Sequence, residues 1–237
     1  MCGRYSLIHT AQEIAARFDV SAPTGFEPRA NVAPTQSMPV VRRGDEAGER
    51  RHQLDTLRWG LVPFWAKDIT IGARMINARS ETAAEKPSFR AAFARRRCLV
   101  PCDGFYEWVE KDGQKWPLRI TVDGGELGAF AGLWERWSDA EGRVTESFTI
   151  LTAQAAPVIH DIHARMPVWA PEEYWDSWLF DDDIAQDVIT AMIEAFPEKH
   201  IGYGPVSRAL NRPQNDDISL IEAISKEGLP ERKIQPR

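Results

Sequence analysis

The second residue of the chain is a cysteine, in the segment Met1-Cys2-Gly3-Arg4-Tyr5. Removal of Met1 would give Cys2 a free α-amine beside its thiol, groups with ordinary pKa values of about 7.7–8.0 and about 8.5. Such a 1,2-aminothiol condenses with an aldehyde to an imine, and the thiol then closes a thiazolidine ring. An internal cysteine cannot do this because its nitrogen belongs to an amide. Position alone is weak evidence, since many chains begin Met-Cys.

Three further side chains have types suited to acid–base or hydrogen-bonding chemistry. Asn77 follows two apolar residues and can hold a backbone group or a sugar, although a turn residue is the simpler interpretation. Glu107 lies between aromatic residues, so it is either partly removed from water, which suits general acid–base catalysis, or on the solvated face of a strand. His163 is of the residue type best suited to move protons near neutral pH.

Metal chemistry is not expected. His160 and His163 are three residues apart, but no cysteine or carboxylate cluster accompanies them at the usual ligand spacing. Cys98 and Cys102 are four apart and lie beside prolines, so Cys98 is expected in the core. An odd count of three cysteines in a chain of this length favours a reducing compartment.

Aromatic and basic residues permit contact with nucleic acid. Nine tryptophans are many for 237 residues, and core packing is expected for most of them. Exposed rings mixed with arginine would suit single-stranded nucleic acid, where bases stack and phosphates meet guanidinium groups. The net charge is −6, but the first half of the chain is basic and the second acidic, which permits a basic face. The arginine candidates are Arg4, Arg42, Arg43, Arg74, Arg79, Arg90 and residues 95–97.

The elements that must position these residues follow from local patterns. Thr10 and Glu13 form a capping box that predicts a helix over 10–18, and residues 22–39, rich in proline and glycine, predict a loop. The Asp112-Gly113 turn between apolar runs predicts a hairpin. Strands are expected at 40–41, 57–62, 98–101, 104–110, 116–122, 129–135 and 147–152, and helices at 81–97 (interrupted near Pro87), 155–164, 171–179 and 183–196.

This order of elements predicts one α+β domain over residues 1–237, built on a mostly antiparallel sheet or open β-barrel with flanking helices. The tail from about residue 212 is expected to be peripheral. No run approaches 18 apolar residues, and a basic segment followed by an apolar one is missing at the N-terminus. A cytoplasmic protein without a membrane segment is therefore expected.

Seven segments together resemble the SOS response-associated peptidase (SRAP) family, which includes bacterial and vertebrate sensors of abasic sites in single-stranded DNA. They run in the family's order over nearly the whole chain: residues 1–5, 31–34, 59–66, 76–81, 98–108, 162–167 and 205–211. Any one of them would be weak evidence. The resemblance implies the SRAP fold, no cofactor, no metal and no obligate protein partner.

The resemblance also implies roles for individual residues. Cys2, freed of Met1 by the protein itself, would attack the aldehyde of an abasic site and end as a thiazolidine crosslink that shields the lesion, with weak lyase activity possible. Asn77 would position the Cys2 backbone and the sugar, Glu107 would act as acid and base, and His163 would transfer protons. The implied DNA contacts are Gly3, Arg4, Trp65, Arg79, Thr152, Arg165, Met166 and Pro167, with arginines on phosphates and Trp65 against a base. The protein would be cytoplasmic and nucleoid-associated when bound to DNA.

Two other functions remain open from the residues alone. Cys2, Asn77 and His163 are also compatible with an N-terminal-nucleophile amidohydrolase or cysteine peptidase, which would turn over a peptide in trans. Alternatively, the protein is a passive single-stranded DNA-binding module in which Cys2 is incidental. In that case replacement of Cys2 would leave its function intact.

Overall fold

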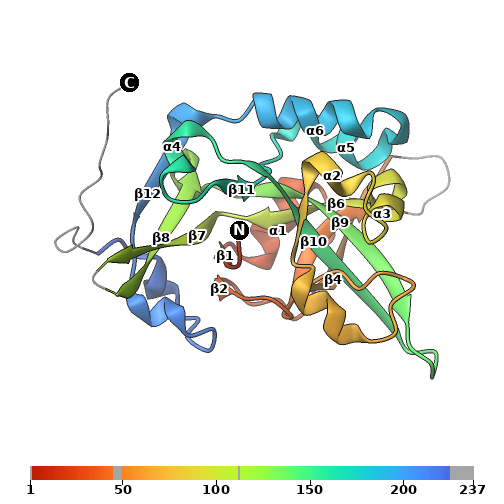
Figure 1. The fold of residues 1–237 in the computed structure, drawn as a ribbon, viewed down its shortest axis with the longest axis horizontal. Helices are drawn as coiled ribbons and strands as arrows, with labels where there is room; N and C mark the ends of the chain where they lie inside the picture. Colours follow the sequence, from red (N-terminus) through yellow and green to blue (C-terminus); the bar gives the residue numbers. More distant parts are fainter. Residues whose placement is uncertain (1, 45–49, 112, 225–237) are drawn as a thin grey trace.

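The computed structural model describes residues 2–44, 50–111 and 113–224. One antiparallel sheet of five strands has the order β12-β8-β7-β1-β2 and is called the open sheet below. Its strands are β1 (Tyr5–Leu7), β2 (Arg29–Val32), β7 (Gly104–Lys111), β8 (Gln114–Val122) and β12 (Ile201–Pro205). Figure 1 shows β7 and β8 on one side of the molecule and the second group of strands on the other.

The second group of strands closes on itself. β10 pairs with β4 and with β9, and β3 and β6 complete the ring β10-β4-β3-β6-β9. We call this ring the barrel; only its β10–β4 pairing is parallel. Its strands are β3 (Ser37–Arg43), β4 (His52–Trp59), β6 (Arg97–Cys102), β9 (Gly128–Ser138) and β10 (Val144–Gln154), and two short strands, β5 (Asn77–Arg79) and β11 (Arg165–Pro167), pair with β10. The α+β prediction on a mostly antiparallel scaffold is confirmed.

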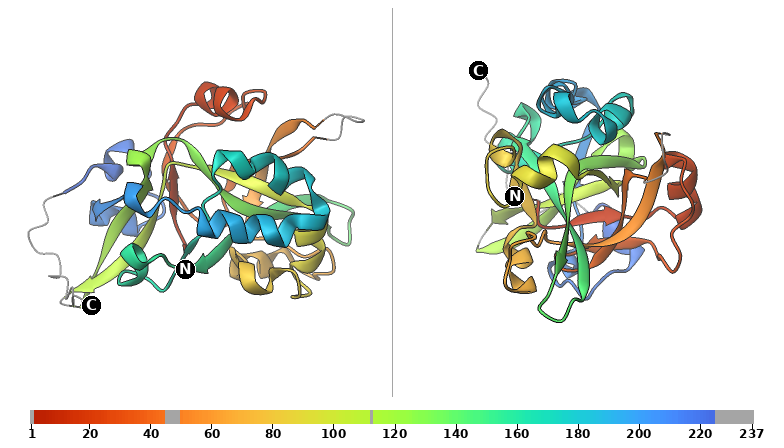
Figure 2. Two further views of the ribbon diagram at one scale, coloured as in Figure 1. Left: turned by 90° about the horizontal axis from the view of Figure 1, so that it is seen from above. Right: turned by 90° about the vertical axis from the view of Figure 1, so that its right-hand side faces the viewer.

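Short helices surround these strands, with α5 and α6 side by side at one edge (Figures 1 and 2). The α-helices are α1 (Ala11–Phe18), α2 (Ser80–Ala83), α3 (Arg90–Arg95), α4 (Pro157–His160), α5 (Trp175–Phe180) and α6 (Ala185–Glu194). The 3-10 helices are η1 (Ile69–Arg74), η2 (Asp123–Gly125), η3 (Glu172–Tyr174), η4 (Asp182–Ile184), η5 (Glu198–His200), η6 (Arg208–Asn211) and η7 (Ile218–Ile221). Among the described residues, no helix is long and apolar enough to span a bilayer.

Helix α1 forms where the capping box predicts it. The Thr10 side chain accepts a hydrogen bond from the backbone N–H of Glu13, and the Glu13 carboxylate accepts one from the N–H of Thr10. Ile14 and Phe18 then point into the core from one helix face. The helix expected over 81–97 is divided into α2 and α3, with Pro87 in the gap, so the predicted interruption is confirmed.

Three local predictions are corrected. The loop expected over 22–39 contains β2 and the start of β3, because pairing with β1 buries Ala30 and Val32 despite the flanking prolines. The strand expected over 57–62 ends at Trp59, since Gly60 has a φ of 120°. The helix expected over 155–164 is only α4, because the chain turns toward β11 after it. The Asp112 part of the predicted hairpin turn lies outside the described residues.

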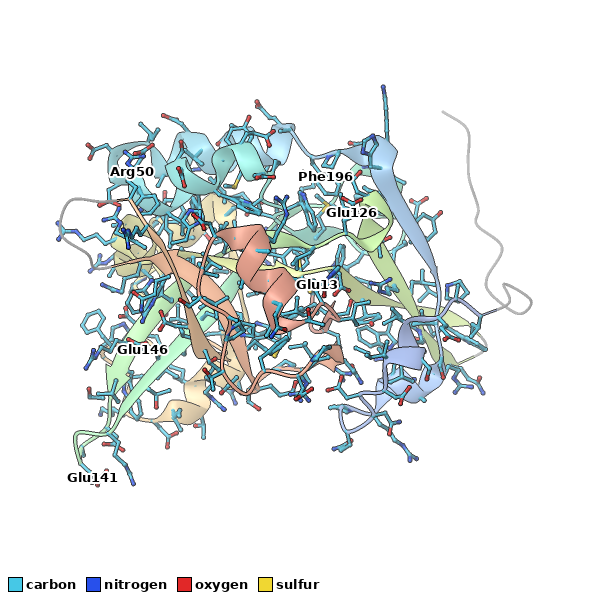
Figure 3. The ribbon with its side chains drawn as sticks, turned by 180° about the vertical axis from the view of Figure 1, so that it is seen from behind. Glu13, Arg50, Glu126, Glu141, Glu146 and Phe196 are labelled. Carbon is cyan, nitrogen blue, oxygen red and sulfur yellow. The ribbon has the colours of Figure 1, made fainter. Side chains whose placement is uncertain are left out.

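The core fills the barrel and the layer between the barrel and its helices. Trp59 and Trp178 are fully buried in it, and Cys98 is buried there as expected. The β9–β10 hairpin extends away from this core, with Glu141 at its tip (Figure 3). Charged residues at this tip form ion pairs with each other and are in contact with solvent.

The segment that follows η6 folds against β2. The side-chain amide of Asn31 donates to the carbonyls of Leu210, Arg212 and Asn215. Asp216 in turn accepts from the backbone N–H of Asn31. We call Arg4, Asn31 and residues 210–216 the clamp, since they bind the described end of the chain to the open sheet.

Candidate active site between the open sheet and the barrel

Cys2 lies where the open sheet meets the barrel. It precedes β1, and β1 pairs with β7 through Tyr5 and Phe105. The thiol of Cys2 is fully buried and donates a hydrogen bond to the backbone oxygen of Arg4 at 3.4 Å. Burial, together with the nearby negative charge of Glu107, raises the pKa of this thiol well above its ordinary range. The thiol is therefore protonated at neutral pH.

Asn77 holds the backbone of Cys2. Its Nδ2 donates to the carbonyl oxygen of Cys2 at 2.7 Å, across the junction between β5 and the start of the chain. The Oδ1 of the same amide is buried and has no hydrogen-bond partner within the part of the chain that the structure describes. The amide thus fixes Cys2 with one end and presents an acceptor with the other.

The end of β4 and the residue that follows it hold the segment that carries Asn77. The indole of Trp59 donates to the carbonyl oxygen of Ile76 at 2.9 Å, beside Asn77. Gly60 approaches Gly72 of η1 so closely that a Cβ atom on Gly60 would come within 2.5 Å of the Gly72 carbonyl oxygen. Glycine is required at this contact, since any side chain would displace the segment that carries Asn77.

Glu107 and His163 lie opposite each other. Glu107 comes from β7 and is only 5% exposed, so its predicted withdrawal from water is confirmed over the solvated alternative. His163 lies between α4 and β11, and its Nδ1 is 4.0 Å from Oε1 of Glu107. The same Nδ1 lies 3.0 Å from the backbone nitrogen and 2.9 Å from the backbone oxygen of Arg165, and these contacts orient the ring. A carboxylate and an imidazole thus lie close together, and the carboxylate is near the Cys2 thiol.

Arg165 is held on both sides of its guanidinium group. Nη1 and Nη2 donate to the two carboxylate oxygens of Glu81 at 3.0 and 2.9 Å. On the other side, Nε bonds Oγ1 of Thr152 at 3.3 Å and Nη2 bonds the Thr152 backbone oxygen. Glu81 belongs to α2 and Thr152 to β10, so Arg165 connects β11 with both elements.

The neighbours of Arg165 differ in exposure. Thr152 pairs with Arg79 in β5 on one side and with Pro167 in β11 on the other. Arg79 is exposed, whereas Pro167 is buried. Met166 is buried as well, and its sulfur accepts a hydrogen bond from the backbone N–H of Ala156 at 3.4 Å. Met166 therefore packs behind the surface that Arg79 and Arg165 present.

Trp65 extends from the segment that positions Asn77. Its side chain is 48% exposed, and the neighbouring Phe64 is 60% exposed. The segment is nevertheless firmly bonded: the backbone N–H of Val62 donates to Ser147 Oγ, and the Trp137 indole donates to the Ala66 carbonyl. Two adjacent aromatic rings are thus in contact with solvent on a segment that is hydrogen-bonded to the rest of the fold.

Arg4 lies two residues from Cys2, but its guanidinium group belongs to the clamp. Nη1 donates to Oδ1 of Asn31 at 2.6 Å and to the carbonyl oxygen of Leu210 at 2.9 Å. The group also lies over the ring of Trp108, 5.7 Å from its centroid. Burial lowers the pKa of Arg4 from its ordinary value. Gly3, between Cys2 and Arg4, is half-buried.

Several other arginine candidates bond within the protein. Arg97 is buried and donates to carbonyls of Phe93, Ala94 and Trp178, and Arg42 pairs with Asp55 and Glu146. Their expected availability to nucleic acid is therefore wrong, because both side chains are largely removed from solvent and both bond to acceptors within the protein. Arg74, Arg90 and Arg95 are exposed.

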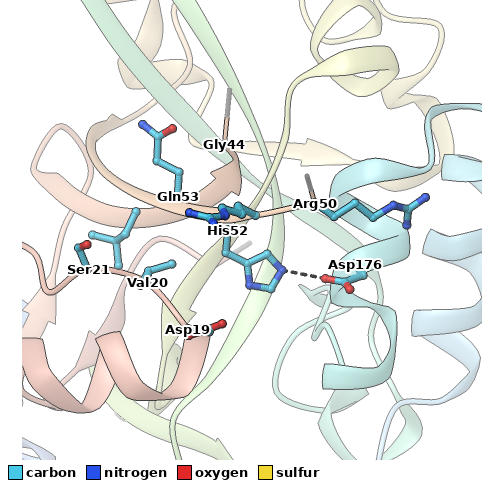
Figure 4. Close-up of a pocket in the computed structure, with 10 residues that line it drawn as sticks. Asp19, Val20, Ser21, Gly44, Arg50, His52, Gln53 and Asp176 are labelled. Carbon is cyan, nitrogen blue, oxygen red and sulfur yellow. Dashed lines mark hydrogen bonds and ion pairs between the residues drawn. The ribbon is translucent and has the colours of Figure 1, made fainter. Parts of the chain in front are cut away.

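The large pocket of Figure 4 shares no residue with the Cys2 site. Its volume is about 810 Å³, and it lies between the end of α1, β4 and α5. His52 crosses it, with Nε2 2.8 Å from Oδ1 of Asp176 and Nδ1 2.9 Å from the Phe18 carbonyl oxygen. Both acidic and basic side chains line it. Among the described residues, no cluster of His, Cys, Asp or Glu is arranged to hold a metal ion.

Glu81 and Asn31 lie in segments that resemble the SRAP family, and the sequence alone predicted no role for either. Glu81 is the carboxylate partner of Arg165, and Asn31 is the centre of the clamp. Their partners lie 84 and 179 residues away, so local patterns contain no signal for these contacts. The one signal in the sequence was the position of each residue inside a segment that resembles the family.

Comparisons with known proteins identify a family and several relatives of this chain. A family model described as SOS response associated peptidase (SRAP) matches residues 1–213. The abasic site processing protein YoqW of Bacillus subtilis (strain 168) is 38% identical over 228 residues, which cover 94% of this chain and 100% of that protein. The abasic site processing protein HMCES of Xenopus tropicalis is 28% identical, over 84% of this chain and 67% of that protein.

A solved structure shares the architecture. The crystal structure of a protein from Bacteroides thetaiotaomicron superimposes with a TM-score of 0.83 over 94% of this chain and 100% of that chain. At 24% identity, this likeness shows the fold alone.

Proposed function

This chain belongs to the SOS response associated peptidase family, and from that premise we propose that it captures abasic sites in single-stranded DNA through Cys2. Relatives named as abasic site processing proteins support the choice of substrate. The observation that carries the proposal is the bond from Asn77 to the carbonyl of Cys2, which fixes the N-terminal cysteine beside Glu107 and His163. Once Met1 is removed, this arrangement places an aminothiol next to an acid–base pair.

The proposed chemistry begins with the amine. The abasic sugar is mostly a closed hemiacetal, so proton transfers must open it to the aldehyde, a task for Glu107. The α-amine of Cys2 adds to the aldehyde carbon, and loss of one water gives an imine. The buried thiol is protonated, which favours the amine as the first nucleophile.

The thiol completes the reaction. Its sulfur adds to the imine carbon and its proton passes to the nitrogen, which closes a thiazolidine ring without a further leaving group. The product is lighter than protein plus DNA by one water. Ring closure competes with β-elimination of the 3′ phosphate from the imine, so lyase activity is expected to be weak.

Asn77 and His163 support this assignment through their polar atoms. The buried Oδ1 of Asn77, an acceptor with no donor among the described residues, suits a hydroxyl of the sugar. His163, held by the backbone of Arg165, faces Glu107 and would exchange protons with the substrate. Burial of an unpaired amide oxygen costs free energy in the empty protein, which a bound hydroxyl would recover.

DNA contacts are proposed for residues on the elements around Cys2, Glu107 and His163. Arg79 and Arg165 would bind phosphates, and exposed Trp65 would stack on a base. Thr152, Met166, Pro167 and Gly3 would shape the surface around them. Arg4, whose guanidinium group bonds inside the clamp, would act by positioning the chain before β1 rather than through a phosphate.

The peptidase alternative is less well supported. A cysteine peptidase needs its thiol within hydrogen-bond reach of a base, whereas the Cys2 thiol donates to the Arg4 carbonyl. Peptide cleavage by this family member is proposed only for its own Met1. The proposed location is the cytoplasm, in association with the nucleoid when DNA is bound.

Intact-mass spectrometry tests the proposal directly. The purified protein is measured before and after incubation with a single-stranded oligonucleotide that carries one abasic site. Loss of Met1 and a covalent adduct one water lighter than the sum of the partners are expected. An unchanged protein mass with Met1 already absent would contradict the proposal.

A further inference from the structure

The guanidinium group of Arg165, which the proposed function assigns to a DNA phosphate, already binds a carboxylate. Two parallel hydrogen bonds of 3.0 and 2.9 Å join it to Glu81. Arginine binds phosphate through the same two-pronged geometry. Glu81 therefore occupies the donors that a phosphate would need.

The two sides of Arg165 are not equivalent. Thr152 is fully buried in β10 and accepts from Arg165 through its backbone oxygen and its hydroxyl. The side chain of Glu81 is 50% exposed, while that of Arg165 is only 18% exposed. An incoming anion would thus displace Glu81 and leave the bonds to Thr152 in place.

Glu81 is anionic at neutral pH. Burial raises the pKa of its carboxyl group, but hydrogen bonds from Arg165 and from its own backbone N–H, with the charges of Arg165 and Arg79, lower it below its ordinary value. Arg79 is exposed two residues before Glu81. A displaced Glu81 carboxylate would therefore have a second cation close by.

We propose that Glu81 competes with DNA for Arg165: it occupies the guanidinium group until a DNA phosphate displaces it, and so weakens reversible binding to single-stranded DNA. The inference rests on the proposed function. Exchange of a carboxylate for a phosphate costs the same on intact and on damaged DNA. This common cost leaves the ratio of the two affinities unchanged. It lets intact DNA dissociate sooner, whereas an abasic site is retained by the covalent bond.

The test measures reversible binding without chemistry. Fluorescence anisotropy is recorded for an undamaged single-stranded oligonucleotide and for one with a tetrahydrofuran abasic analogue, which has no aldehyde. Glu81→Gln is expected to bind both about two- to fivefold more tightly than the wild type, the range for loss of one exposed ion pair. The gain should shrink as salt rises, because salt screens the competing pair.

Two further variants isolate the role of Arg165. Glu85→Gln makes the same charge change at an exposed residue four positions along the chain and should leave both affinities unchanged. In an Arg165→Ala background, Glu81→Gln should have no effect. Thermal melting of each variant verifies that it is folded.

The outcomes separate the inference from its premise. If Arg165→Ala weakens binding while Glu81→Gln leaves it unchanged or weaker, Glu81 only orients Arg165 and the inference is wrong. Tightening by Glu81→Gln in the Arg165→Ala background would show a general field effect and would also overturn it. If Arg165→Ala has no effect on binding, the phosphate assignment fails and the inference fails with it.

Discussion

Arg165 and Arg4 were both expected to bind phosphate, yet their surroundings differ. Arg4 donates to Asn31 and to the Leu210 carbonyl and lies over a ring, so its partners belong to the clamp. Arg165 has one buried partner and one half-exposed carboxylate. The first arrangement joins parts of the fold, and the second leaves donors that a ligand can reach.

The comparison shows that residue type does not determine role for arginine. The guanidinium group binds carbonyls, amides, carboxylates and phosphates with the same donors. The role of an arginine depends instead on whether a ligand can replace the acceptors of its guanidinium group. Replacement of the acceptors of Arg4 would break the contacts that join the start of the chain, β2 and residues 210–216. Replacement of Glu81 at Arg165 would release only one side chain.

The largest effect is expected from replacement of Cys2, which should remove the chemistry of the Cys2 site and leave the clamp unchanged. Cys2→Ala should abolish the heat-stable DNA adduct, because no internal cysteine can form the thiazolidine ring. Reversible binding and the melting temperature should remain close to those of the wild type, since the clamp is intact. Denaturing gels with abasic-site DNA and a melting curve measure the two properties. A persistent heat-stable adduct would refute the role of Cys2.

Glu107→Gln is expected to slow crosslinking by about 100-fold or more, in the range for loss of a general acid–base group. The amide keeps the size of the side chain but cannot exchange a proton. Single-turnover rates of adduct formation provide the measurement. Unchanged kinetics would move the acid–base role elsewhere, whereas loss of DNA binding would indicate a structural role for Glu107.

Asn31→Ala should have the opposite effects: a lower stability of the fold and a nearly unchanged crosslinking rate. Removal of the Asn31 side chain takes one of the two acceptors of Arg4 Nη1 and leaves the Arg212 and Asn215 carbonyls without their Asn31 donor, so we expect a loss of about 2–3 kcal/mol in the free energy of unfolding. Urea denaturation measures the change. The crosslinking rate of the protein that stays folded should change little. A strong loss of that rate at unchanged stability would erase the distinction between the clamp and the site.

Arg165→Ala should reduce affinity for single-stranded DNA by about tenfold and lower the slope of log K against log salt by about 0.7, as expected for one lost phosphate contact. Arg4→Ala is the matched variant. It should lower the melting temperature while the salt slope stays constant, because the Arg4 guanidinium group bonds within the fold. Equal salt slopes for the two variants would contradict the proposed difference between them.

Local patterns in the sequence predict much of the framework. The capping box gives α1 its start, Pro87 divides a helix, and apolar runs mark β6 to β10. The loop predicted over 22–39 fails because β2 is stabilised by its partner β1 rather than by its own composition. Closure of the barrel could not be predicted either, since it depends on β10 pairing with both β4 and β9.

The sequence by itself determined the chemistry that is available: a cysteine at position 2, and an asparagine, a glutamate and a histidine in family-like segments. The tertiary structure decided which of these groups meet and what each arginine does. Asn77 reaches Cys2 across 75 residues, and Arg4 reaches Leu210 across 206. Hydrogen bonds act over about 3 Å, so partners this far apart along the chain are determined only when the strands pair.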